Sequence, residues 1–230
     1  MPIPCLIAPS SEDVGIDPAA LQRLFDRAAE EVAQSRIEAC QVAVARHGRL
    51  AGMATFGATP DGRAATNETL FAMFSAVKPI SAAAIWKLLE QGALTLDQPA
   101  ADVIPEFATN GKDAVTLRQV LTFTAGFPGA NAFALISGEG LAGRREHETL
   151  LGTSAGRCAA FATWSLDWAP GTAYAYHSEG AHWLLAEIIA RVTGGDYRDY
   201  IRSAILDPMG LDTFFLGCPV DEQHRYHFAD

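Results

Sequence analysis

Apolar side chains recur at helical spacing in several segments of the chain. Asp17 and Pro18 read as an N-cap followed by proline at the first helical position, and the apolar positions after them predict a helix that ends near Ser35. A second helix is predicted from Val77 to Gly92. The remaining helices are predicted over residues 116–121, 181–192 and 196–207.

Two short apolar runs, residues 40–45 and 50–57, flank the turn residues His47 and Gly48. This pattern predicts a β-hairpin that follows the first helix. A helix, a hairpin and a mainly helical middle together indicate a mixed α/β architecture. Residues 127–156 are rich in glycine with little periodicity, which is typical of a long surface loop.

The composition is that of an ordered globular protein, with 49% hydrophobic and 19% charged residues. Lysine and arginine number 17 against 27 aspartate and glutamate, so the formal net charge is −10. That charge repels phosphate, and we expect neither nucleic acid nor a membrane surface as partner. The apolar stretches are too short for a membrane span or a signal-peptide core, which predicts a cytoplasmic protein.

The four cysteines are scattered, without a C-x-x-C pair and without a histidine at metal-ligand spacing. We expect buried free thiols, no metal site and no organic cofactor.

Ser75 and Lys78 form an S-x-x-K pattern at the predicted start of the second helix. Residues at i and i+3 face the same side of a helical turn, so the lysine amine lies within reach of the serine oxygen. Serine is a weak nucleophile that a neighbouring amine can activate, and backbone N–H groups of the first turn can bind a developing oxyanion. Taken alone, the pattern is weak, and an N-cap serine beside a solvated lysine explains it better.

Tyr176 lies in an extended segment, PGTAYAYHS, where it and Ser178 project to one side and His177 to the other. A tyrosine beside an ammonium group can ionise below its usual pKa of about 10 and serve as a general base. Without the serine and the lysine, the same residue would be an ordinary tyrosine with a bonded hydroxyl.

With these motifs, the sequence resembles the serine beta-lactamase and penicillin-binding protein superfamily, in the branch of class C beta-lactamases and family VIII esterases. The matching segments occur in order along the chain: QVAVARHGRLAGMATFG, TLFAMFSAVKPI, LLEQGALTLDQPAADVIPEF, TLRQVLTFTAGFP and PGTAYAYHSEGAHWLLAEIIARVTGGDY through DPMGLDT. The resemblance implies a beta-lactamase-like fold, a mainly helical domain beside an antiparallel sheet. The expected divisions are an N-terminal part over 1–78, the helical domain over 79–215 and the start of a C-terminal portion over 216–230.

Carried onto this chain, the resemblance makes Ser75 the acylated nucleophile, Lys78 its activator and Tyr176 the base. The family's Y-x-N element has serine here, Ser178, whose shorter side chain weakens contacts to the lysine and the substrate. His177 stands where a small polar residue is common, and it joins Ser178 as a substrate-binding candidate.

Family members carry a third motif, such as K-T-G, on a C-terminal strand, and none follows Tyr176. We therefore expect the C-terminal strands, which are absent from this chain, to come from further chain or from a second polypeptide partner. The expected function is ester hydrolysis of a small molecule through a serine acyl-enzyme. The alternatives are a D-amino-acid peptidase, amide hydrolase or beta-lactamase, or a non-catalytic member that binds a ligand or partner.

A competing motif, G-x-S-x-G, occurs over residues 152–156 and is the nucleophile elbow of α/β-hydrolases. An elbow follows a β-strand, but the preceding RREHETLL is charged and helix-prone. We expect a flexible loop turn here.

Overall fold

The computed structural model describes residues 6–128, 151–177 and 179–227. Two compact units divide the chain, one of residues 1–73 with 210–230 and one of residues 74–209. The turn at 74–77 packs with the helix that follows it. The division expected from the sequence, with boundaries after residues 78 and 215, stays a prediction.

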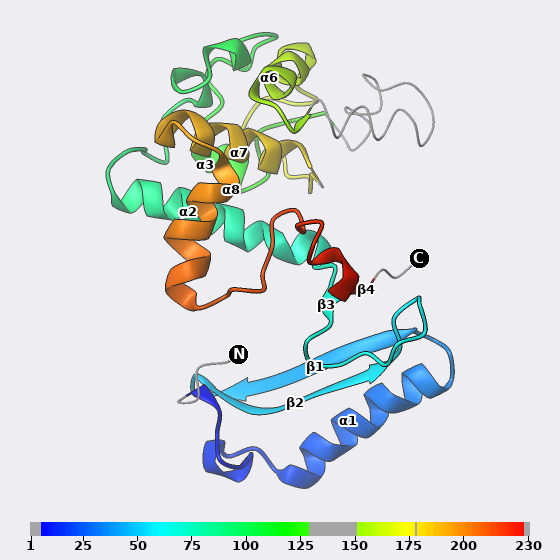
Figure 1. Cartoon of the computed structure of the whole chain (residues 1–230). Coiled ribbons are helices and arrows are strands. Elements are labelled where there is room, and N and C mark those ends of the chain that lie inside the picture. Colours follow the sequence, from blue (N-terminus) through cyan, green and yellow to red (C-terminus); the bar gives the residue numbers. More distant parts are fainter. Residues whose placement is uncertain (1–5, 129–150, 178, 228–230) are drawn as a thin grey trace. The chain divides into compact units, whose positions relative to one another are not determined.

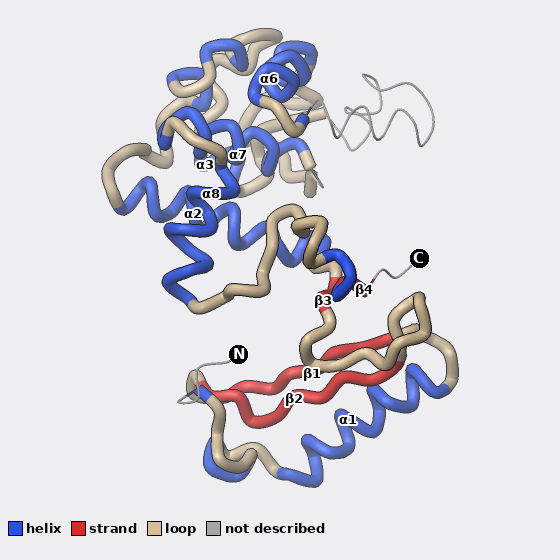
Figure 2. Tube along the Cα trace, viewed as in Figure 1, coloured by secondary structure: helices blue, strands red, loops and turns tan. Residues whose placement is uncertain are grey.

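The first unit is built on a β-hairpin covered by a helix (Figure 2). Its elements are α1 (Pro18–Ala33), β1 (Ala39–Arg46), β2 (Arg49–Gly57), β3 (Leu70–Phe71) and β4 (Tyr226–His227). The predicted N-cap is confirmed, because the Asp17 carboxylate accepts a hydrogen bond of 2.8 Å from the Ala19 amide. β1 and β2 pair antiparallel, as predicted, while β3 and β4 form a short parallel pair that the sequence pattern did not predict.

Gly52 allows α1 to approach the hairpin. A Cβ atom at this position would lie 2.9 Å from the Leu21 side chain and 3.2 Å from the ring of Phe25. Both residues belong to the apolar face of α1. Because Gly52 has no side chain, α1 can pack closer to β2 than any larger residue would allow.

The second unit is helical, and α7 lies at its centre (Figure 1). Among its described residues, the α-helices are α2 (Lys78–Glu90), α3 (Leu117–Leu121), α6 (Ser154–Thr163), α7 (Gly180–Thr193) and α8 (Tyr197–Ile201). α7 contacts the other four, and its buried residues include Leu184, Leu185, Ile188 and Ile189. The helices predicted for this region are present. The last continues beyond α8 as one π-helical turn and then a 3-10 turn, 207–209, that contains Pro208.

Most of the predicted loop over residues 127–156 lies outside the described residues. Among the described cysteines, Cys158 is a buried free thiol, whereas Cys40 is free but only half-buried.

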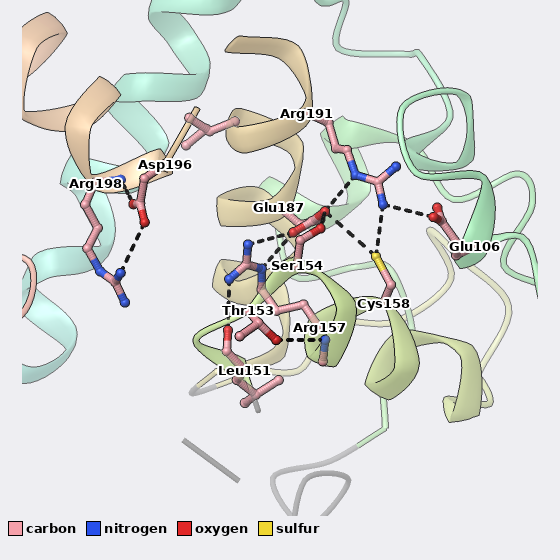
Figure 3. Close-up of polar contacts among 12 residues, drawn as sticks. Glu106, Leu151, Thr153, Ser154, Arg157, Cys158, Glu187, Arg191, Asp196 and Arg198 are labelled. Carbon is pink, nitrogen blue, oxygen red and sulfur yellow. Dashed lines mark hydrogen bonds and ion pairs between the residues drawn. The ribbon is translucent and has the colours of Figure 1, made fainter. Parts of the chain in front are cut away.

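A fully buried carboxylate, Glu187, joins α7 to α6 (Figure 3). Arg157 reaches it through two nitrogens, at 2.7 and 2.8 Å, and Arg191 pairs with it at 2.8 Å. The Ser154 hydroxyl donates a further hydrogen bond of 2.5 Å. Burial alone would raise the pKa of Glu187, but the hydrogen bonds from these three residues outweigh it and hold the pKa below its usual value.

Arg157 also holds the start of the α6 segment, because it donates to the Leu151 carbonyl at 2.9 Å. Arg191 reaches Glu106 at 2.9 Å, which extends the network to the turn at residues 105–107. One buried charge thus ties three segments of the helical unit together.

We predict that Glu187→Gln lowers the free energy of unfolding by about 3 kcal/mol, because it leaves the buried Arg157 without its counter-ion. The wild type should also lose stability as pH falls through the lowered pKa of Glu187, and the variant should lack this acid dependence. Urea unfolding followed by circular dichroism measures both effects. Glu90→Gln is the matched control, because Glu90 pairs with Lys87 on the surface and its loss should change little.

Candidate active site

Three side chains meet at the Ser75 hydroxyl. The Lys78 ammonium nitrogen donates to Ser75 Oγ at 3.0 Å, and the Tyr176 hydroxyl donates to the same oxygen at 2.7 Å. Lys78 Nζ lies 5.5 Å from the centre of the Tyr176 ring. The structure therefore brings together the three residues that the sequence identified as catalytic candidates, all within the helical unit.

Local helix geometry explains how Ser75 and Lys78 meet. Residues Phe74–Val77 form a 3-10 turn, and α2 begins at Lys78 with Pro79 in its first turn. A 3-10 turn has three residues per turn, so side chains at i and i+3 eclipse each other. Ser75 thus lies in the 3-10 turn that precedes α2, and Lys78 is the first residue of α2.

Phe74, which precedes Ser75, has a φ of 44° and is 78% exposed. A positive φ is uncommon for a bulky residue and costs backbone energy. Backbone strain of this kind clusters at functional sites, and here it lies next to the candidate nucleophile.

Phe123 holds the tyrosine segment, and sequence reasoning missed it. Its carbonyl accepts a hydrogen bond from the Ala175 amide at 3.2 Å, and its ring centre lies 5.3 Å from that of Tyr176. Phe123 also has a positive φ, of 56°. The available signal was its place directly after the short helix α3, in the sequence LTFTAGFP.

Gly126 ends the same turn with a φ of 81°. A Cβ atom there would lie 2.3 Å from the Trp168 carbonyl oxygen, so only glycine fits. Its own carbonyl accepts a hydrogen bond from the Asp167 amide at 2.8 Å, which fixes the segment leading to Tyr176.

Tyr176 has the electrostatics expected of a base. The hydrogen bonds to Ser75 and Lys78, together with the charge of Lys78, lower its pKa below the usual value. Its side chain is half exposed. A lowered pKa makes the phenolate more accessible near neutral pH, which is the form that accepts a proton.

His177 faces the interior. It is 4% exposed, and its ring stacks on Trp168 with 6.3 Å between centres. Burial lowers the pKa of His177, so its ring is uncharged at neutral pH and packs as an aromatic side chain. Contact with substrate stays a prediction for this residue, and Ser178 lies outside the described residues.

The G-x-S-x-G motif is the start of a helix, and the expected flexible turn is wrong. Thr153 N-caps α6, and the Ser154 hydroxyl donates its hydrogen to Glu187. Its hydrogen-bond partner is thus a buried carboxylate within an ion-pair network, where a hydrolase elbow needs a histidine base.

Among the described residues, no cluster of three histidine, cysteine, aspartate or glutamate side chains could hold a metal ion. Within the same part of the chain, no helix is both long and apolar enough to cross a membrane.

Comparison with known proteins shows the family of the chain. The family model described as Beta-lactamase matches residues 22–230. The chain belongs to the beta-lactamase family. The resemblance to the serine beta-lactamase and penicillin-binding protein superfamily is thereby confirmed.

Relatives in this family include esterases. Esterase EstB of Burkholderia gladioli is 30% identical over 84% of this chain and 50% of its own length. Esterase/beta-lactamase LipL of Mycobacterium tuberculosis is 29% identical over 64% of this chain and 31% of its own. The chain spans half or less of the length of these curated relatives.

The predicted fold class is confirmed by a solved structure of a penicillin-binding protein homologue from Caulobacter crescentus. It superposes with a TM-score of 0.72 at 29% identity, over 93% of this chain and 54% of the other. The shared fold is therefore the mixed helical and antiparallel arrangement of the beta-lactamase family.

We predict that the reaction of Ser75 with a fluorophosphonate speeds up as pH rises, because the phenolate of Tyr176 is the active base. The midpoint should lie below pH 10, in line with the lowered pKa. Tyr176→Phe should slow labelling by about a hundredfold or more and abolish this pH dependence. Tyr174→Phe is the control, because Tyr174 is exposed and packs edge-on against Phe123. Equal pH profiles for wild type and Tyr176→Phe would contradict the assignment.

Proposed function

We propose that this protein is a serine hydrolase that cleaves carboxylic esters of small molecules, in the manner of the family VIII esterases. The observation that carries the proposal is the pair of hydrogen bonds that Lys78 and Tyr176 make to Ser75 Oγ. A nucleophile within hydrogen-bond reach of its base is the signature of covalent catalysis. The esterase names of two relatives support an ester over other acyl substrates.

The proposed reaction runs in two steps. The Ser75 oxygen attacks the ester carbonyl carbon, and its proton passes to the Tyr176 phenolate, with the ammonium of Lys78 stabilising the charge. The proton then goes to the alkoxide leaving group as the carbon–oxygen bond breaks, which leaves an acyl group on Ser75. In the second step the tyrosine takes a proton from water, whose oxygen attacks the acyl carbon. As the bond between that carbon and Ser75 Oγ breaks, the proton passes from the tyrosine to Ser75 Oγ, and the carboxylic acid leaves. No step of this sequence requires a cofactor.

Amide or lactam cleavage is the second candidate reaction. The name of LipL pairs esterase with beta-lactamase, and the solved relative is a penicillin-binding protein homologue. The same acyl-enzyme chemistry serves all three substrates, because each presents a carbonyl carbon to the serine. Relative turnover of a nitrophenyl ester, a cephalosporin and a D-alanyl peptide separates them.

The proposal includes strands beyond residues 1–230 that complete the sheet, on continuing chain or on a second polypeptide. Among the residues of β1 and β2, none is fully buried. A hairpin covered on one face leaves backbone groups and apolar surface for further strands. Intact mass spectrometry of active material tests this: a single species of 24.5 kDa with full activity would contradict it. A cytoplasmic location stays a prediction.

We predict that the protein hydrolyses a short-chain nitrophenyl ester faster than a cephalosporin, and that Ser75→Ala abolishes this turnover. Ser154→Ala is the matched control, because Ser154 is the serine of the rival motif and should retain turnover per folded molecule. A wild type that binds the ester without turnover would favour the non-catalytic alternative. Turnover that survives in Ser75→Ala but not in Ser154→Ala would overturn the assignment of the nucleophile.

A further inference from the structure

Phe74 is a bulky apolar residue joined directly to the candidate nucleophile. It precedes Ser75 in the same 3-10 turn, so the Cα atoms of the two residues lie about 3.8 Å apart. Ser75 and the residue after it, Ala76, are exposed as well. The surface at the candidate nucleophile is therefore open along this turn, and the Phe74 ring is the large apolar group on it.

The backbone of Phe74 has a conformation that suits glycine. Its φ of 44° lies in the left-handed region, where a Cβ atom costs energy and glycine pays no such cost. Among the described residues, the other non-glycine residues with a positive φ are Ser35, His47, Asn110 and Phe123. The two phenylalanines are the bulky apolar members of this set.

Packing explains the strained backbone of Phe123 but not that of Phe74. The Phe123 ring contacts four other rings, those of Tyr174, Tyr176, His177 and His182. The Phe74 side chain is 78% exposed, so it buries little apolar area and contributes little to the stability of the fold. Single exposed apolar side chains are ordinary on protein surfaces. Phe74 differs from these because the fold holds it in a costly conformation beside the candidate nucleophile, which indicates a use in the reaction.

We propose that Phe74 is a specificity-determining residue whose ring contacts the acyl group of the ester, and that the preferred acyl groups carry an aromatic ring. This inference rests on the proposed function and names the substrate class for it. Two aromatic rings pair in offset or edge-on geometry and gain more than their apolar area alone provides. An exposed phenylalanine ring is free to form such a pair.

The acyl part of the ester is the part that stays beside Phe74. In the proposed reaction the carbonyl carbon bonds to Ser75 Oγ, and this bond lasts until water has attacked the acyl-enzyme. The alcohol takes its proton from Tyr176 and leaves after the first step. A residue joined directly to Ser75 therefore stays within reach of the acyl group in both steps, and selection by Phe74 acts on that group.

Two esters that differ only in the acyl group test the inference on the full chain. The phenylacetate ester of p-nitrophenol adds one phenyl ring to the acetate ester. The ratio of their kcat/KM values is the readout, because a change in the Ser75 turn itself affects both esters alike. Phe74→Ala and Phe74→Gly should lower this ratio about tenfold, and Phe74→Tyr should retain it because it keeps the ring.

Thermal unfolding gives a second readout that a purely structural role would move in the opposite direction. Phe74→Gly removes the ring and the strain together, so its midpoint should equal or exceed that of the wild type. Ser35→Gly is the matched control, because Ser35 also has a positive φ, of 54°, and is exposed in the other compact unit. This control should keep the wild-type ratio of the two esters. If Phe74→Ala does not fold, the contrast between the Gly and Tyr variants decides the matter.

Three results would overturn the inference alone, with the acetate ester still hydrolysed. The first is a wild-type ratio in the Ala and Gly variants. The second is a lower unfolding midpoint in Phe74→Gly, because the ring would then belong to a packed surface, such as one against the strands proposed beyond residues 1–230. The third is an unchanged phenylacetate ratio with a lower ratio of benzyl acetate to ethyl acetate, which would move the contact to the alcohol. A wild type that hydrolyses none of these esters would overturn the proposed function and the inference with it.

Discussion

Two hydrogen bonds, from Lys78 and from Tyr176, converge on Ser75 Oγ, and the candidate site depends on both. The tyrosine lies 101 residues from the serine along the chain, so only the tertiary fold can bring the two together. The lysine, by contrast, is placed by a single 3-10 turn. A local constraint and a long-range constraint thus meet at one oxygen atom, and the site works only if both hold.

Two parts of the helical unit supply the long-range constraint. Phe123 and Gly126 adopt positive φ angles that turn the chain after α3 and give the tyrosine segment its hydrogen bonds. The buried Glu187 ties α6 to α7, the helix that follows the tyrosine segment along the chain. Removal of either partner from such a pair leaves a buried charge without its counter-ion, so the network fixes how the two helices pack.

The sequence predicted the parts of the fold that depend on local pattern. The N-cap at Asp17, the hairpin and most helix positions follow from periodicity and turn residues, and the structure has them. The parallel pair β3–β4 was not predicted, because two-residue strands that lie far apart in the sequence leave no periodic signal. The start of α6 was also missed, because residues 152–156 were expected to form a flexible loop turn. A cap from Thr153 and a hydrogen bond from Ser154 to the distant Glu187 make this segment the start of a helix instead.

The same division applies to the site. Ser75, Lys78 and Tyr176 carry motif signals, whereas Phe123 holds the tyrosine segment through contacts that no spacing rule describes. The most direct test of the central claim is mass spectrometry of the protein quenched during ester turnover, with peptide mapping of the trapped acyl group. The account predicts an adduct on the peptide that contains Ser75, at the serine itself. An adduct on Ser154, or turnover with no acylated serine at any quench time, would contradict it.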